Sequence, residues 1–323
     1  GIRTRFKLLH FTNPQPLPTI LDKKKMIEIG KQYSKDDLVD PSGFLRKARF
    51  HQSKFRSEIL KLPFDTYGNY LIKEDGEKGL NFYDGFGVFD AVKNYRKYNK
   101  PLYSNMLRSE HIPFNIFIPL EKNKIYCKSV FNEILNNSIK AIDRIEIEFA
   151  PKEKYLKDRT AFDTYIEYTH IDNSKGIIGI EVKYTEKEYK LLKDSKESID
   201  ISEKKSKYFY YTEKCGIFKK GVEEKLISDK FRQIWRNHLL GESIIIENAD
   251  FKHFTSITLF PEKNSHFVET CKEYNDLLKE NKNRFIGVTY EVFFEHLKKY
   301  SPDNEYLKWA NYLSSRYLIS DDK

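Results

Sequence analysis

Residues 162–168 read FDTYIEY and residues 179–186 read GIEVKYTE, and these two segments decide the fold. Both alternate apolar and polar side chains and are rich in β-branched and aromatic residues, which is typical of strands. Because alternate residues of a strand share a face, Glu181 and Lys183 should project together while their apolar neighbours point into the core. The stretch 170–176 between the strands is rich in turn-forming residues, so we expect an antiparallel hairpin.

The register of this hairpin determines which acidic side chains meet. A turn centred on Asp172 would place Asp163 opposite Glu181, whereas a slip of one or two residues would bring Glu167 closer to Glu181 instead. Two adjacent carboxylates form a site suited to Mg²⁺ or Mn²⁺, and Lys183 on the same face could stabilise charge on a phosphate. The alternative is a surface hairpin whose charges form weak cross-strand salt bridges.

The segments around the hairpin indicate an α/β fold. Helical spacing and strand-like alternation predict helices over 43–60, 128–141, 228–240, 266–281 and 290–300, and strands over 144–149, 254–260 and 285–289. Gly241 is expected to end the helix that Ser228 begins. Helices that alternate with strands in this way are typical of a sheet covered by helices on both sides.

Composition indicates a cytoplasmic protein with no membrane segment. No stretch of the 323 residues approaches the ~20 apolar residues that a membrane helix needs. The three cysteines, Cys127, Cys215 and Cys271, are isolated from one another and form no metal-binding or disulfide pattern. Such usage is typical of a reducing compartment.

Positive charge is concentrated near the N-terminus. The net charge is +9, and the first 110 residues carry 21 Lys and Arg against 13 Asp and Glu. A basic region of this kind suits contact with a polyanion, although solvated lysine-rich faces would produce the same count. The nucleic-acid contacts that we expect in the basic helix over 43–60 are Arg46, Arg49, Lys54 and Arg56.

The two strand segments resemble the PD-(D/E)XK nuclease superfamily, and more closely a bacterial restriction-endonuclease-like branch of it. Three further stretches match that branch in the same order: HQSKFR at 51–56, SEHIPFNIF at 109–117 and QIWRNHLL at 233–240. One departure is that Phe162 stands where the superfamily has its literal Pro.

The resemblance implies a restriction-endonuclease-like core, with a mixed central sheet flanked by helices and a basic N-terminal extension. It implies a basic arm and helical region over 1–100 that contacts DNA, and a nuclease core with C-terminal helices over 101–323. It makes Asp163 and Glu181 the ligands of Mg²⁺, for which Mn²⁺ could substitute, and Lys183 the catalytic lysine.

Further site residues follow from the same resemblance. Family members often add an acidic residue from an earlier helix, and Glu110 is the candidate here, with Glu148 and Glu167 as alternatives. Gln233 is expected to face the active cleft, and Arg236, on the same helix, to contact nucleic acid.

The function expected from this reading is that of a DNA endonuclease of restriction or phage-defence type, acting as a homodimer or in a larger defence complex. The alternative is a non-catalytic nucleic-acid-binding subunit on a nuclease-like fold; a weaker one is an interaction module for an acidic partner. The chain contains no G-x-S-x-G and no G-x-x-x-x-G-K-[ST], so neither a serine hydrolase nor an ATPase is expected.

Overall fold

The computed structural model describes residues 43–151, 154–187, 191–192, 195–203, 206–280 and 284–319. Most of the basic N-terminal arm that the sequence predicts therefore lies outside the described residues. Within those ranges, no helix is long and apolar enough to cross a lipid bilayer.

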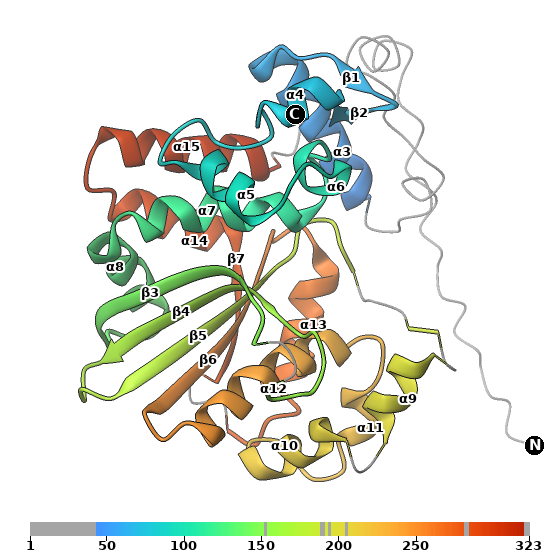
Figure 1. Cartoon of the computed structure of the whole chain (residues 1–323), viewed down its shortest axis with the longest axis vertical. Coiled ribbons are helices and arrows are strands. Elements are labelled where there is room, and N and C mark those ends of the chain that lie inside the picture. The colour runs from blue at the N-terminus through green and yellow to red at the C-terminus, as the bar shows by residue number, and fades with distance from the viewer. Residues whose placement is uncertain are drawn as a thin grey trace, which may run out of the picture.

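The chain forms one large sheet, one small hairpin and many short helices (Figure 1). The strands are β1 (Phe64–Asp65), β2 (Tyr67–Leu71), β3 (Ile139–Phe149), β4 (Phe162–His170), β5 (Lys175–Val182), β6 (Phe251–Phe260) and β7 (Phe285–Thr289). The helices up to β3 are α3 (Phe44–Lys54), η1 (Phe55–Leu60), α4 (Lys73–Glu77), α5 (Val88–Tyr95), α6 (Lys100–Tyr103), η2 (Ser109–His111), α7 (Ile112–Glu121) and α8 (Lys124–Ile134). The later helices are α9 (Lys196–Ser202), α10 (Lys207–Cys215), α11 (Glu223–Leu226), α12 (Arg232–Glu247), α13 (Ser265–Asn275), α14 (Tyr290–Lys299) and α15 (Asn304–Tyr317).

The large sheet has the strand order β3-β4-β5-β6-β7 and is mixed. The pairs β3–β4 and β4–β5 are antiparallel, whereas β5–β6 and β6–β7 are parallel. Figure 1 shows α7, α14 and α15 on one side of the sheet and α10, α12 and α13 on the other. One apolar core fills each side, so the predicted α/β fold with a mixed central sheet is confirmed.

The β4–β5 hairpin has the register that the sequence predicts for a turn centred on Asp172. Thr164 pairs with Ile180, and extending this register by one residue places Asp163 opposite Glu181. Glu167 lies four residues further along β4, so the slipped register is excluded. A period of two therefore brings the acidic side chains to one face at the same end of the hairpin.

The expectation that Gly241 ends a helix is wrong. Helix α12 begins at Arg232 and continues through Gly241 to Glu247. A Cβ atom on this glycine would lie 1.9 Å from the ring of Phe254 on β6. The glycine therefore allows close packing of α12 against the sheet. In the sequence, this role cannot be distinguished from that of a glycine that ends a helix.

The helix predicted over 128–141 also ends earlier than expected. Helix α8 stops at Ile134, and Ile139 already begins β3. Between them Asn136 and Asn137 adopt left-handed conformations, with φ of 52° and 58°. Asparagine tolerates this region better than most residues, so the pair forms the turn that reverses the chain onto the sheet.

Candidate active site

Asp163 lies at the start of β4, beside the end of β5. Its Oδ2 accepts a hydrogen bond of 2.7 Å from the backbone N–H of Val182. Across the described ranges, no hydrogen bond reaches its other carboxylate oxygen. One oxygen is therefore fixed by the neighbouring strand, and the other remains available to a ligand.

Glu181 on β5 is held by two amides from α12. Gln233 donates through Nε2 to Oε1 at 2.9 Å, and Asn237 donates through Nδ2 to Oε2 at 2.7 Å. Gln233 and Asn237 are four residues apart, so they lie one helical turn apart on the same face. The role of Asn237 escaped the sequence analysis, although its spacing from Gln233 was a usable signal.

Lys183 completes the group, two residues beyond Glu181 on the same face. Its Nζ lies 3.0 Å from Oε1 of Glu181 and donates to Oε1 of Gln233 at 2.7 Å. Burial lowers the pKa of Lys183, but nearby carboxylates, led by Glu181, more than offset this and raise it overall. The lysine is therefore a charged ammonium in a mostly buried position.

The electrostatics of the pair of carboxylates favour a bound cation. Burial, followed by repulsion from Glu181, raises the pKa of Asp163 well above its usual range, although Lys183 and the backbone hydrogen bond oppose the shift. A divalent cation held by these carboxylates would offset both the cost of burial and the repulsion from Glu181. Oxygen donors of this kind are the ligands that Mg²⁺ and Mn²⁺ prefer, so the residues fit the metal that the resemblance implies.

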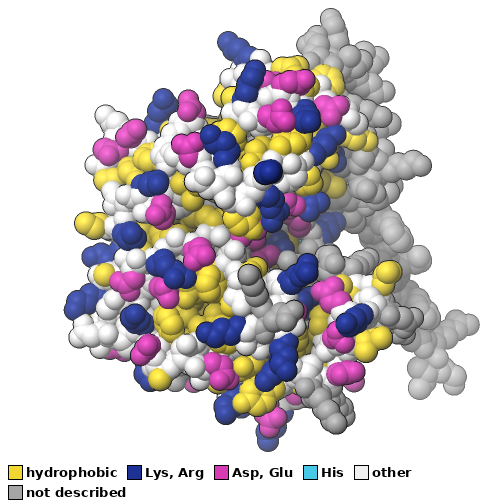
Figure 2. Space-filling model, in the orientation of Figure 1, with side chains coloured by type: hydrophobic (Ala, Val, Ile, Leu, Met, Phe, Trp, Pro, Cys, Tyr) yellow, Lys and Arg dark blue, Asp and Glu magenta, His cyan; other side chains and the backbone are white. Residues whose placement is uncertain are grey.

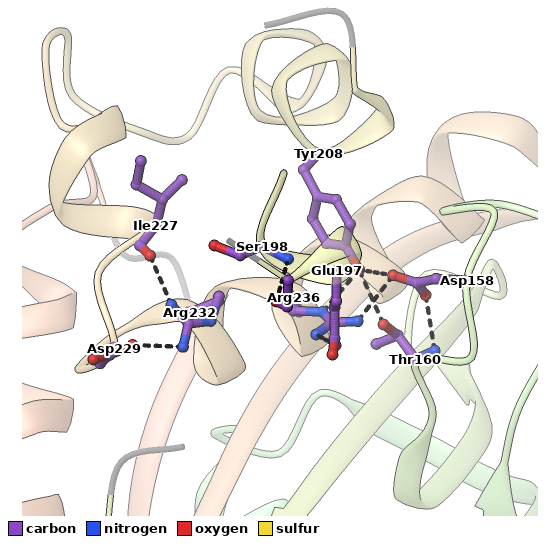
Figure 3. Close-up of polar contacts among 10 residues, drawn as sticks. Asp158, Thr160, Glu197, Ser198, Tyr208, Ile227, Asp229, Arg232 and Arg236 are labelled. Carbon is purple, nitrogen blue, oxygen red and sulfur yellow. Dashed lines mark hydrogen bonds and ion pairs between the residues drawn. The ribbon is translucent and has the colours of Figure 1, made fainter. Parts of the chain in front are cut away.

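Both carboxylates open into a pocket of about 360 Å³ between the sheet and α12. Its lining residues are Arg159, Thr160, Ala161, Asp163, Glu181, Glu197, Arg232, Gln233, Arg236 and Asn237. Gln233 thus lies where the resemblance placed it. Arg236, expected to contact nucleic acid, is ion-paired with Asp158 at 3.0 Å and with Glu197 at 2.5 Å (Figure 3).

Among the described residues, none of the three candidates for a third carboxylate is hydrogen-bonded to the pair, and Glu167 forms an ion pair of 3.4 Å with Arg144. Glu110 in η2 forms an ion pair of 2.9 Å with Arg108. The pairing of β3 with β4 places Glu148 level with Asp163, and its charge contributes to the raised pKa of Asp163. Its side chain, however, accepts hydrogen bonds from Tyr95 and Arg96. Position therefore favours Glu148 over Glu110.

The arginines expected to contact DNA from the helix over 43–60 are turned inward. Arg49 donates to Asn69 on β2 at 2.9 Å, and Arg56, only 2% exposed, donates to the carbonyl oxygens of Gly68 on β2 and of Leu62 just before β1. Arg46 is also buried, while Lys54 is half-buried over the ring of Phe50. Burial and hydrogen bonds to the protein's own groups favour a structural role for Arg49 and Arg56, and contact of the four basic residues with nucleic acid stays a prediction.

The face seen in Figure 2 carries no single basic band. Lys and Arg side chains are interspersed with Asp and Glu over the whole visible surface. The uneven charge along the sequence therefore does not translate into a separated patch on this face.

A second group of metal-type ligands lies at the opposite end of the hairpin. His170, Asp172 and His253 bring their ligand atoms within 4.8 Å of one another. The two imidazole rings, however, are stacked face to face with centroids 3.8 Å apart and planes 12° apart. A metal ion must lie in the plane of each imidazole that binds it, so the observed arrangement is a hydrogen-bonded cluster and not a preformed metal site.

Comparison with known proteins agrees with the geometry. A family model described as the PD-(D/E)XK nuclease superfamily matches residues 38–319. No curated protein and no solved structure gives a match. Because the matched range covers nearly the whole chain and includes every residue of the acidic pocket, this protein belongs to the PD-(D/E)XK nuclease superfamily.

Proposed function

We propose that this protein is a nuclease that hydrolyses DNA phosphodiester bonds with Mg²⁺ held by Asp163 and Glu181. Membership of the superfamily implies a metal-dependent nuclease. The observation that carries the finer proposal is that the carboxylates of Asp163 and Glu181 line one pocket, with the ammonium group of Lys183 3.0 Å from Glu181 and the pKa of Asp163 raised by its surroundings.

The roles of the side chains follow from their contacts. The metal, when bound, polarises the scissile phosphate and lowers the pKa of a water molecule. Lys183 places its ammonium beside Glu181, where it can stabilise negative charge that develops on the phosphate oxygens. Gln233 donates to Glu181 and accepts from Lys183, so one amide orients both groups relative to each other.

We further propose that the enzyme is a cytoplasmic endonuclease of restriction or phage-defence type. This rests on the resemblance of 51–56, 109–117 and 233–240 to the restriction-endonuclease-like branch. Expression of the active protein should then reduce the plating efficiency of at least one phage, and Lys183→Ala should restore it. Equal protection by the variant would contradict a defence role that depends on cleavage.

Cleavage of supercoiled plasmid tests the nuclease activity. Wild type should nick or linearise the plasmid with Mg²⁺ or Mn²⁺ and not with EDTA. Lys183→Ala should reduce the rate roughly 10²–10³-fold, because it removes a charge that acts on the transition state. The matched control is Lys175→Ala, an exposed lysine at the other end of β5, which should cleave like wild type.

Two outcomes would contradict the proposal. Cleavage by Lys183→Ala at the wild-type rate would remove the lysine from the mechanism. Tight, salt-sensitive DNA binding without cleavage by the wild type would instead favour the non-catalytic nucleic-acid-binding subunit.

A further inference from the structure

Three arginines line the acidic pocket, and two of them are already neutralised by the protein. Arg236 is ion-paired with both Asp158 and Glu197, and its side chain is only 16% exposed. Arg232 is ion-paired with Asp229 at 2.6 Å and donates to the carbonyl of Ile227 at 3.0 Å (Figure 3). The guanidinium groups of Arg236 and Arg232 therefore bind carboxylates of the protein itself and stabilise the segments that line the pocket.

Arg159 differs from both. It is exposed, lines the same pocket, and lies four residues before Asp163. Throughout the described part of the chain, it takes part in no ion pair or hydrogen bond. Its guanidinium group thus keeps its donors available in the pocket that the two carboxylates line.

The backbone on either side of Arg159 is firmly anchored. Oδ1 of Asp158 accepts from the N–H of Thr160 at 2.8 Å, and the hydroxyl of Thr160 lies 3.0 Å from that of Tyr208 on α10. Tyr208 also donates to Oδ2 of Asp158, and Arg236 on α12 donates to the same oxygen at 3.0 Å. Figure 3 shows Asp158 and Thr160 converging on Tyr208 and Arg236.

This arrangement pre-organises the side chain of Arg159, which forms no ion pair or hydrogen bond within the described residues. Because both neighbours of Arg159 are tied to helices, its Cα is held at the pocket rim, and binding a ligand costs less conformational entropy than it would from a free loop. The pocket also contains Asp163, Glu181 and Glu197, which would repel an anion. The guanidinium group of Arg159, which lines the same pocket, offsets that repulsion.

We propose that Arg159 forms a phosphate-binding subsite that contacts the nucleic-acid backbone next to the scissile phosphate. A guanidinium group suits this ligand because it can donate two parallel hydrogen bonds to phosphate oxygens. Arg236 is then a positioning residue that holds the 158–160 segment and does not contact the substrate. The assignment rests on the proposed nuclease function for the identity of its ligand.

The test compares Arg159→Ala and Arg159→Lys with Lys157→Ala. Lys157 is exposed on the same segment and carries the same charge, but it does not line the pocket. Binding of a short fluorescent DNA duplex is measured by anisotropy in EDTA, which prevents cleavage, over a series of salt concentrations. Thermal melting reports whether each variant remains folded.

Arg159→Ala should weaken binding about tenfold and reduce the slope of log K against log salt by about 1, as expected for one lost phosphate contact. Arg159→Lys should keep the slope but recover only part of the affinity, because lysine cannot bind in a bidentate manner. In cleavage assays, KM should rise more than kcat falls. Lys157→Ala should match wild type in all three measurements.

The inference is overturned if Arg159→Ala and Lys157→Ala show the same affinity and salt slope. Since the binding assay needs no catalysis, it separates this proposal from the proposed function. A wild type that binds DNA without cleaving it would refute the nuclease assignment, whereas the slope of Arg159→Ala would still decide the phosphate contact.

Discussion

The two ends of the β4–β5 hairpin each carry a cluster of side chains that could bind a metal, yet the clusters differ in how their charges are compensated. At one end Asp163 faces Glu181 in a pocket. At the other end, in the turn, Asp172 lies beside His170 and His253. The carboxylate of Asp172 in the turn has several hydrogen-bond donors, whereas that of Asp163 in the pocket has one among the described residues.

In the turn, the carboxylate is fully supplied with donors. Hydrogen bonds from Ser174, and then from His253, hold the pKa of Asp172 well below its usual range. In the pocket, burial and the neighbouring Glu181 instead raise the pKa of Asp163. A bound cation is favoured where the protein supplies few hydrogen-bond donors to a buried carboxylate. The number of donors around Asp163 and Asp172 therefore distinguishes the two ends of the hairpin better than the types of residue do.

The largest effect within this comparison should come from the amides that hold Glu181. Asn237→Ala should lower cleavage activity about 10–100-fold and raise the Mg²⁺ concentration needed for half-maximal rate, because a metal ligand loses the partner that orients it. The measurement is the cleavage rate over a Mg²⁺ titration. Glu247→Gln, at the exposed end of α12, is the control, and an unchanged Mg²⁺ requirement in Asn237→Ala would show that orientation of Glu181 is unimportant.

A smaller effect should distinguish the candidates for the third carboxylate. Glu148→Gln should reduce the cleavage rate about tenfold, since Glu148 is level with Asp163 on the adjacent strand. Glu110→Gln should change the rate less than about twofold, because Glu110 is paired with Arg108. Parallel rate measurements at fixed Mg²⁺ decide between them, and the reverse order of effects would restore Glu110 as the preferred ligand.

The unfavourable position of the Asp163 carboxylate should also affect the thermal stability of the metal-free protein. A raised pKa means that the metal-free fold favours protonated Asp163 and loses this stability as pH rises through the folded-state pKa. Asp163→Asn cannot ionise, so in EDTA at pH 8 it should melt about 2 °C above wild type, the size of a ~1 kcal/mol change in a protein of this length.

Calorimetry in EDTA at pH 5 and pH 8 provides the measurement. The gap should be smaller at pH 5, where wild-type Asp163 is more fully protonated, and Mg²⁺ at pH 8 should raise the Tm of wild type more than that of the variant. A variant that melts below wild type at both pH values would mean that the pair is already compensated.

The smallest effect should come from the turn. His253→Ala removes one partly exposed hydrogen bond to Asp172, so Tm should fall by no more than about 2 °C. Plasmid cleavage should stay at the wild-type rate, and Zn²⁺ should shift the Tm of wild type and of His253→Ala by the same amount. A zinc-dependent rise in Tm that His253→Ala abolishes would show that the stacked rings can turn and bind a metal.

Much of the hairpin could be predicted from local sequence. The period of two in residues 162–168 and 179–186, together with turn-forming residues between them, predicted a hairpin in which a turn centred on Asp172 places Asp163 opposite Glu181. These rules operate over a few residues, so the local sequence is sufficient for the hairpin, while the slipped register is excluded only by the observed strand pairing. The α/β class followed from the same local patterns, and the mixed sheet followed from the family resemblance.

Interactions between distant segments could not be predicted in this way. Arg49 and Arg56 appear as basic helix residues, yet Asn69 and Gly68 on β2 turn them inward. Gly241 has the sequence signature of a helix stop, but the ring of Phe254 requires a glycine there for close packing. In each case, the deciding partner belongs to another element.

The sequence by itself determined the strands and the shared face of Glu181 and Lys183, because a backbone period of two acts between neighbours, whereas the structure decided between the two hairpin registers. Only the tertiary structure decided which charges remain available. Arg236 is neutralised by Asp158 and Glu197, which lie 78 and 39 residues away in the chain, while Arg159 is not paired within the described residues. Charge compensation depends on distances of a few ångströms in space, and sequence separation carries no information about these.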